Sequence, residues 1–397
     1  MSRPTISAER YEQRILAAQE QLPAEDASAL LVGVGPDLQW LTGYGAKELE
    51  RLTMLVLPAA GRATVIVPRL ERAAAEAATA VKAKLVDVAT WEETEDPFAL
   101  VAARLEQSNS RPEIQLGALG GAWGRLGGLL VSDRLWATFL LRLQSAVPDA
   151  AFGLGSAILG PLRAAKDPDE IELLRLAAHA ADRVVQAIAA GRLVGRSESD
   201  VAREVRDRLI DEGHDTAGFW IVASGPNSSS PHHEPTDRVI NAGEPIVLDI
   251  GGLLSGYSSD TTRTLWVTGD ADIGPSDDFA KLYEVLQRAQ AASLAAVKPG
   301  VECQGIDRAA RSVIADAGMG ELFIHRTGHG IGIEGHEDPY MVEGNEQELE
   351  AGNAFSVEPG IYIDGRHGAR IEDIVVCTDS GADVLNETTH DLLVVRG

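Results

Sequence analysis

The sequence has few cysteines, a deficit of basic residues and no long apolar run, and each shortage excludes a class of protein. Only two cysteines occur among 397 residues, Cys303 and Cys377. They are too few for a disulfide framework and lack the spacing of zinc ligands. Lys and Arg number 35 against 60 Asp and Glu, which leaves a net charge of -25. This balance argues against nucleic acid or an anionic membrane as a partner.

No stretch of the chain has the composition of a targeting or membrane-spanning segment. The first residues, MSRPTISAERYEQRI, are polar and charged, and no apolar run follows them. A signal peptide needs an apolar core behind its basic start, and a spanning helix needs about 20 predominantly apolar residues. We therefore expect a soluble cytoplasmic protein without a membrane partner.

The length of the chain suggests two domains of ordinary size. Residues 1–160 alternate helix and strand signals, which is an α/β pattern. A boundary falls near GPLRAAKDPDEIELL, where Asp167, Pro168 and Glu170 have the pattern of a helix start. We expect an α/β domain over residues 1–160 and a second domain over residues 161–397.

The second domain shows the same order of elements twice. Two helices precede strands that run through Val267, and two more helices precede strand-like segments up to Val376. The expected helices cover residues 168–191, 197–213, 277–297 and 305–318. This order predicts an α+β domain of two similar halves.

Four acids stand in or beside segments that otherwise look buried. They are Asp249, Asp260, Glu358 and Glu372. The first two belong to a predicted hairpin of Ile246–Ile250 and Thr261–Val267, and Glu372 is expected inside an apolar strand. For one such acid alone, a salt bridge would be the commoner explanation. Four like charges that share a site would raise one another's pKa and destabilise the fold.

A pair of divalent cations would remove this difficulty. Basic residues in these segments are too scarce to neutralise four acids; Arg263 and Arg370 are the obvious candidates. Two divalent ions supply the positive charge that four carboxylates require, and a neutral histidine can join them. A carboxylate-rich, thiol-free site suits manganese, cobalt or iron(II) better than structural zinc. Two adjacent ions activate water and polarise a carbonyl oxygen, which predicts hydrolysis of amides or phosphate esters.

The local motifs around these acids and one histidine resemble those of the pita-bread metallopeptidases. The matching residues are Asp249 in VLDIG, Asp260 in SDTTRT, His329 in GHGIG, Glu358 in VEPGIY and Glu372 in RIED. They resemble, in order, the five metal ligands of a family that includes methionine aminopeptidase, aminopeptidase P and prolidase. The resemblance covers about residues 165–397. Upstream, PDLQWLTGY resembles a motif in the N-terminal domain of the prolidase and aminopeptidase P branch.

The resemblance implies a role for each ligand. Asp249 would chelate one of two divalent ions, and His329 and Glu358 would hold the other. Asp260 and Glu372 would bridge both. Glu358 would also carry a proton from the attacking water to the leaving nitrogen. Manganese is the favoured metal, with cobalt, iron(II) and zinc as alternatives.

Five further residues complete the expected site. His232 resembles the histidine that positions the substrate, and His336 resembles the one that stabilises the gem-diolate intermediate. Arg370 would orient the bridging carboxylates, and His325 resembles a further histidine of the aminopeptidase P branch. Tyr257 either lines the pocket or packs in the hairpin.

The histidines also have ordinary explanations. Residue type alone would make His232 and its neighbour His233 loop histidines, and would make His336 a core histidine. We expect His233 to be the ordinary one. The stretch GALGGAWGRLGG at 117–128 does not spell the dinucleotide fingerprint, and we expect a loop there.

The family implies hydrolysis of the peptide bond before proline by a homodimeric enzyme that acts on a proline-containing peptide. Several prolidases place an arginine where this chain has Tyr340 in HEDPY, and that arginine would clasp a dipeptide carboxylate. Its absence keeps open an aminopeptidase P activity on longer peptides. Trp220 stands where a smaller residue is expected and would narrow the cleft.

Two readings from other classes remain on the same fold. One is a metal-free, creatinase-like amidinohydrolase, and the other is a non-catalytic pita-bread binding module. Proteins of both kinds lose metal ligands, whereas this sequence keeps all five. Metal analysis of the purified protein distinguishes the peptidase from these alternatives.

Overall fold

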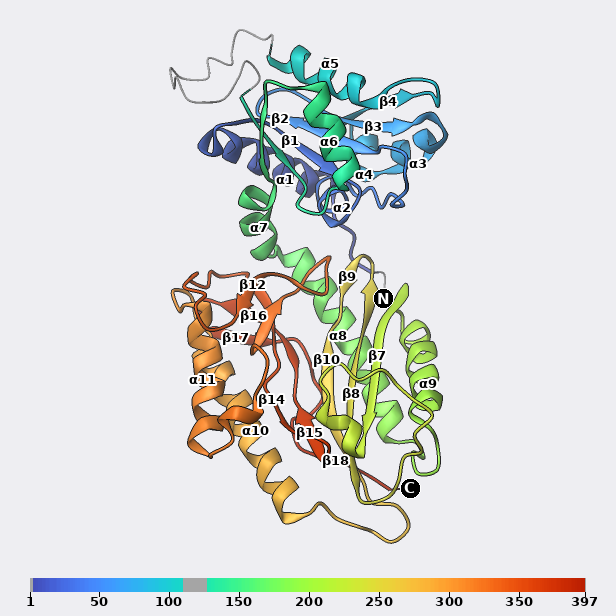
Figure 1. Ribbon diagram of the computed structural model, residues 1–397, viewed down its shortest axis with the longest axis vertical. Helices are drawn as coiled ribbons and strands as arrows, with labels where there is room; N and C mark the ends of the chain where they lie inside the picture. The colour runs from blue at the N-terminus through green and yellow to red at the C-terminus, as the bar shows by residue number, and fades with distance from the viewer. Residues whose placement is uncertain (1–2, 110–126, 397) are drawn as a thin grey trace. The chain divides into compact units, whose positions relative to one another are not determined.

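The structure, a computed structural model, describes residues 3–109 and 127–396 (Figure 1). All but the last two residues of the glycine-rich stretch at 117–128 lie outside this described part. The chain divides into two compact units between Arg163 and Ala164, and the residues up to Thr5 belong to the second unit.

A six-stranded mixed sheet forms the centre of the first unit, in the order β4-β3-β2-β1-β5-β6. Its strands are β1 (Ala27–Gly33), β2 (Met54–Pro58), β3 (Ala63–Pro68), β4 (Val86–Trp91), β5 (Gly128–Val131) and β6 (Ala151–Leu154). Its α-helices are α1 (Ala8–Gln21), α2 (Pro36–Thr42), α3 (Arg72–Ala77), α4 (Thr79–Lys82), α5 (Pro97–Asn109), α6 (Ala137–Ala146) and α7 (Ser156–Ala164). Two 3₁₀ turns accompany them, η1 (Leu22–Glu25) and η2 (Arg69–Glu71).

Strands β1, β2 and β3 are buried along their whole length. Such apolar runs are typical of a sheet that is covered on both faces. Phe98 and Val101 of α5 and Leu143 of α6 pack in one buried cluster with Leu31 of β1. The predicted α/β pattern is confirmed. After β3, the helical segment is interrupted at Ala78, whose extended backbone separates α3 from α4.

The second unit has two halves, each with a pair of helices; the described strands form one sheet in the first half and two in the second. The first half contains α8 (Pro168–Ala189), α9 (Glu198–Asp211), β7 (Thr216–Ser224), η3 (Gly225–Ser229), β8 (Glu244–Leu254), β9 (Tyr257–Ser258), β10 (Thr261–Val267) and β18 (Leu393–Val395). The second half contains α10 (Asp277–Ala296), α11 (Cys303–Asp316), η4 (Gly320–Leu322), β11 (Gly328–Gly330), β12 (Glu337–Met341), β13 (Ala354–Val357), β14 (Gly360–Ile363), β15 (His367–Arg370), β16 (Asp373–Thr378) and β17 (Gly381–Val384).

Sequence-local signals set the starts of the first two helices of this unit. Asp167 caps α8 by accepting hydrogen bonds at 3.0 Å from the backbone N–H groups of Asp169 and Glu170. The carboxylate of Glu170 in turn accepts a hydrogen bond from the backbone N–H of Asp167 at 2.9 Å, which completes the predicted capping box. Ser197 caps α9 in the same way.

Each helix pair packs against the strands of its own half (Figure 1). Apolar side chains of α8 and α9 pack with β7, β8, β10 and β18, in the sheet ordered β18-β10-β8-β7. Helix α10 and part of α11 pack against β14 and β15. The other sheet, ordered β12-β11-β13-β16-β17, packs against α11 residues Cys303 and Ile306. The predicted α+β domain of two similar halves is confirmed.

Among the residues that the structure describes, no helix is both long and apolar enough to span a membrane.

Candidate active site

A cavity of about 660 Å³ opens in the second unit, and nine of the ten predicted site residues line it. Its lining consists of Phe219, Ile221, Pro231, His232, Glu234, Asp249, Asp260, His325, Arg326, His329, His336, Glu358, Arg370 and Glu372. Strands of both halves therefore contribute to one site.

The β8–β10 hairpin carries the first two acids. Asp249 lies within β8 and pairs in register with Thr262 of β10, and Asp260 directly precedes that strand. Both aspartates are buried, at 7% and 5% exposure. The paired strands β8 and β10 fix the positions of both residues. The two carboxylates are therefore held close together by the sheet itself.

Glu372 does not lie inside a strand as expected. It occupies the connection between β15 and β16. Its backbone N–H donates to the carbonyl of Thr262 at 3.1 Å, and its carboxylate accepts the Thr262 hydroxyl at 2.6 Å. At Glu372 the backbone bonds to Thr262 of β10, and not to the strands that pair with β15 and β16. This contact places the Glu372 carboxylate beside Asp249 and Asp260.

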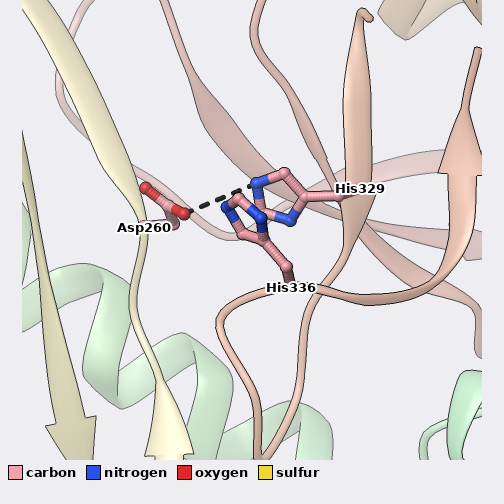
Figure 2. Close-up of side chains that lie close together, drawn as sticks. All are labelled: Asp260, His329 and His336. Atoms are coloured by element: carbon pink, nitrogen blue, oxygen red, sulfur yellow. Dashed lines mark ion pairs between the residues drawn. The ribbon is translucent and has the colours of Figure 1, made fainter. Parts of the chain in front are cut away.

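The second half supplies His329 from β11 and Glu358 from the residue after β13. The Nε2 atom of His329 lies 3.3 Å from Glu358 Oε1 and 3.6 Å from Asp260 Oδ2. Figure 2 shows His329 and His336 turned toward Asp260 from the same side, with ring centroids 3.8 Å apart. Burial, and then the nearby His336, lowers the pKa of His329 to about 3, so its ring is neutral and suited to a metal.

Three overlapping groups of side chains offer ligand atoms that lie within 4.8 Å of one another. They are Asp260 with His329 and His336, His329 with Glu358 and Glu372, and Asp249 with Asp260 and Glu372. The Oδ1 atom of Asp249 is buried without a hydrogen-bond partner. An unpaired buried carboxylate oxygen is costly, and a cation would satisfy it.

The negative charges of these buried acids repel one another. Burial, and next the charges of Asp249 and Glu358, raises the pKa of Asp260 well above its usual value. Burial, and next Asp260, does the same to the pKa of Glu372, and burial raises the pKa of Glu358 to about 7. Bound cations would reverse these shifts. The residues therefore fit divalent metal ions: hard oxygen donors, imidazole, and an excess of negative charge.

Arg370 contacts the acids differently from the prediction. Its guanidinium pairs with Asp249 Oδ2 at 2.5 Å and donates from Nε to the Thr262 hydroxyl at 3.2 Å. Asp249 is one of the non-bridging ligands in the predicted scheme. Arg370 reaches Glu372, a predicted bridging residue, only through the Thr262 hydroxyl.

His325 lines the cavity and belongs to a chain of hydrogen bonds that the sequence did not reveal. Its Nε2 lies 2.9 Å from the Tyr362 hydroxyl, which accepts a bond from Arg370 Nη1 at 2.7 Å. Burial, and then Arg370, lowers the pKa of His325 to about 4. Tyr362 was missed because a tyrosine in the apolar strand GIYI gives no signal beyond β propensity.

His232 and His336 are exposed at the edge of the cavity. The core position that residue type alone suggested for His336 is therefore wrong. His233 points elsewhere, with its Nε2 2.9 Å from the carboxylate of Glu198. Adjacent histidines thus have separate surroundings.

For Tyr257 the structure favours the second of the two alternatives, packing in the hairpin over lining the pocket, and for Trp220 it corrects the expectation. Tyr257 is not among the described residues that line the cavity; it is buried in the hairpin, and its hydroxyl donates to Glu170 at 2.8 Å. Trp220 packs against the cluster under α8 and α9, so it does not narrow the cleft. Strand alternation explains this, because its neighbours Phe219 and Ile221 take the cavity side of β7.

Arg326 is a second residue that the sequence did not single out. It lines the cavity, with its Cζ 4.4 Å from the centroid of the Tyr340 ring and Nη2 3.3 Å from His336 Nδ1. Its signal was its place between His325 and the GHGIG motif. A basic residue in a turn is usually solvated, and only the fold brings this one to the site.

Comparisons with known proteins identify the family. The metallopeptidase family M24 matches residues 172–379, and the creatinase/prolidase N-terminal domain matches residues 14–164. A probable dipeptidase PepE from Mycobacterium tuberculosis is 42% identical over 391 residues, 98% of each chain. An Xaa-Pro dipeptidase from Lactobacillus helveticus is 33% identical and covers 90% of this chain and 92% of its own.

Solved structures give the same result. The crystal structure of dipeptidase PepE from Mycobacterium ulcerans is 43% identical, with a TM-score of 0.87 over 98% of this chain and 99% of that one. A prolidase from Thermococcus sibiricus is 33% identical, with a TM-score of 0.84 over 97% of this chain and 99% of that one. The chain is a peptidase and belongs to metallopeptidase family M24.

Proposed function

We propose that this peptidase cleaves the bond between any residue and a following proline in dipeptides. The observation that carries the proposal is the three overlapping groups of acids and imidazoles, each with ligand atoms within 4.8 Å of one another, in a cavity of about 660 Å³. The relatives named dipeptidase and Xaa-Pro dipeptidase support the substrate class.

Membership of a metallopeptidase family implies divalent metal ions, and we propose two of them. Their ligands are Asp249, Asp260, His329, Glu358 and Glu372. The unpartnered Asp249 Oδ1 and the mutual repulsion of the acids support this set. His336 also offers an atom to one donor group, but it is exposed, and we assign it to the substrate instead.

When bound, such ions activate water and polarise the substrate carbonyl. The remaining tasks fall to side chains of this chain. Glu358, placed at the cavity wall, accepts the proton of the attacking water and delivers it to the leaving proline nitrogen. His336 stabilises the developing oxyanion and His232 positions the substrate from the opposite half of the unit. Arg370 fixes the orientation of Asp249.

The guanidinium group of Arg326 lines the cavity and is suited to bind the carboxylate of a dipeptide. Tyr340 stands where several prolidases have an arginine, yet Arg326 lies over the Tyr340 ring, with Cζ 4.4 Å from its centroid. A guanidinium binds a carboxylate in a bidentate manner. This placement supports a dipeptide substrate despite the change at position 340. Cleavage of longer Xaa-Pro peptides by an aminopeptidase P activity is the alternative.

Substrate length decides between the two activities. We would compare kcat/KM for Xaa-Pro dipeptides with that for the same sequences extended by two residues, using protein loaded with manganese. A dipeptidase should prefer the unextended series by at least tenfold. Equal or greater turnover of extended peptides would identify the aminopeptidase activity, and turnover of neither would overturn the proposal.

Further parts of the proposal concern the metal, the assembly and the domains. We propose manganese as the native metal, with cobalt, iron(II) or zinc as alternatives, and elemental analysis of purified protein tests this. A homodimer and a cytoplasmic location remain predictions, and light scattering tests the first. The proposed domain limits, 1–160 and 161–397, are supported by the division between Arg163 and Ala164.

A further inference from the structure

Outside the metal site, one of the fully buried carboxylates accepts hydrogen bonds from four residues. Glu198, the first residue of α9, has an exposure of 0%. Its Oε1 accepts the backbone N–H and the hydroxyl of Ser224 at 2.8 and 2.7 Å. Its Oε2 accepts His233 Nε2 at 2.9 Å and the hydroxyl of Thr236 at 2.8 Å. Asn227 donates to both oxygens, at 3.0 and 3.1 Å.

These donors lie along one segment, residues 224–236, which begins at the last residue of β7 and forms the first part of the connection to β8. Ser224 ends β7, and Thr236 closes the segment, so a single carboxylate ties its two ends together. His232, which lines the cavity, lies inside the segment, next to the anchored His233.

We propose that Glu198 is a positioning residue for catalysis, because it holds His233 and thereby directs the neighbouring His232 into the cavity. The inference rests on the proposed function, in which His232 positions the substrate. Glu198 does not line the cavity and so acts only through the segment that it holds.

The two sides of His232 are held by different contacts. On one side, the carbonyl of Pro231 accepts a hydrogen bond from each terminal nitrogen of Arg370, both at 3.3 Å. On the other, the His233 ring is bound to Glu198 at 2.9 Å. The first contact belongs to the metal site and the second to the start of α9. Loss of the Glu198 contact leaves His232 attached on one side only.

The strength of the anchor follows from its charge. Burial opposes ionisation of Glu198, yet the hydrogen bonds from Ser224, His233 and Thr236 outweigh it and lower its pKa to about 2. The group is therefore an anion at neutral pH, and each bond to it is charge-assisted, which makes it stronger than a bond between two neutral groups. No other described carboxylate connects both ends of this segment.

A double-mutant cycle tests the inference. Glu198→Gln keeps the shape but offers only one acceptor atom, and we expect kcat/KM on an Xaa-Pro dipeptide to fall about 10- to 100-fold, as for misplaced catalytic groups. In a His232→Ala background the same change should have almost no further effect. An equally large loss in both backgrounds would overturn the inference, as would an unchanged kcat/KM in Glu198→Gln.

Two controls separate positioning from folding. His233→Ala removes one anchor bond without emptying the buried site, and it should reproduce part of the loss even if Glu198→Gln folds poorly. Asp182→Asn changes another buried carboxylate, which accepts the backbone N–H of Glu387 at 2.6 Å. This variant should lose stability and keep its kcat.

A spectroscopic readout is independent of peptidase activity. In metal-free full-length protein with ¹⁵N-labelled histidine, imidazole signals of His232 should be single and sharp, and should broaden or split in Glu198→Gln and His233→Ala. Unchanged His232 signals in both variants would overturn the inference. If the wild type cleaves no peptide, the proposed function fails, while this experiment still decides whether Glu198 orders His232.

Discussion

Two sets of buried carboxylates in the second unit behave in opposite ways. Glu198 and Asp373 are completely buried, and both have a lowered pKa despite burial. Asp260 and Glu372 are nearly as buried, at 5% and 2% exposure, and both have a raised pKa. Burial alone therefore does not decide the ionisation of an acid in this protein.

The difference lies in what surrounds each acid. Asp373 pairs with the buried Arg263 at 2.7 Å and with His390 at 2.6 Å, and Glu198 is surrounded by donors. Asp260 and Glu372 instead face each other and the other acids of the cavity. The chain satisfies the first set by itself and leaves the second to be satisfied by cations.

Metal removal should have the largest effect, because it deprives only the second set of its counter-charge. We expect activity to fall at least about 10³-fold after exhaustive chelation, since metal ions supply several kcal/mol of transition-state stabilisation. Restoration of kcat by added manganese is the control for irreversible unfolding. Full activity in protein shown by elemental analysis to be metal-free would contradict the comparison.

The adjacent histidines sharpen the comparison, because His232 lines the cavity that holds the second set, whereas His233 contacts Glu198 of the first set. His232→Ala should lower kcat/KM about 100-fold, as loss of a preorganised active-site group does. His233→Ala removes only one donor to Glu198, and we expect a loss of about tenfold or less. Steady-state kinetics on one Xaa-Pro dipeptide measures both. Equal losses would show that the wrong histidine is assigned to the substrate.

The stability that Glu198 contributes, as a member of the first set, should decrease at acidic pH over a range set by its pKa. The pKa of Glu198 is about 2 in the folded chain against an ordinary value of 4.5. A lowered pKa stabilises the fold fully above the ordinary value, and that contribution disappears as pH falls from about 4.5 toward 2. The shift corresponds to about 3 kcal/mol at neutral pH.

The measurement compares urea unfolding of metal-free wild type and Glu198→Gln at pH 7 and pH 3. The wild-type advantage should shrink by about 2 kcal/mol between these values, because the shared effect of the cavity acids cancels. His233→Ala retains the carboxylate and most of its donors, so it should keep most of the wild-type pH dependence. A constant advantage across this range would rule out the anchored anion.

The two cysteines add a third kind of buried ionisable group, one without hydrogen-bond donors or cations around it. Of the tests in this comparison, their labelling should have the smallest effect on activity. Burial raises the pKa of Cys303 and of Cys377 to about 11, so both thiols stay neutral. A thiol reagent at pH 7 should label neither residue in the folded protein and should leave activity unchanged. Urea should expose both to labelling, and rapid labelling of the folded chain would show that this core opens.

The local sequence determined the helices, the hairpin and the motifs around the proposed metal ligands. The capping pattern at Asp167 and Glu170 marked the start of α8 because its hydrogen bonds join residues three apart. Asp249 in β8 and Asp260 directly before β10 were recognisable because charge is rare in or beside an apolar strand. Short motifs around them carried the family resemblance, and the fold class followed from the order of elements.

Only the tertiary structure decided which side chains meet at the cavity and which support it. Glu372 owes its position to Thr262, 110 residues away, and Glu198 receives its bonds from residues 26 to 38 positions later. Tyr257 and Trp220 turn away from the cavity, while Arg326 lines it. The physical reason is that periodicity and capping act between chain neighbours. Hydrogen bonds and ion pairs between distant segments exist only after the strands have aligned.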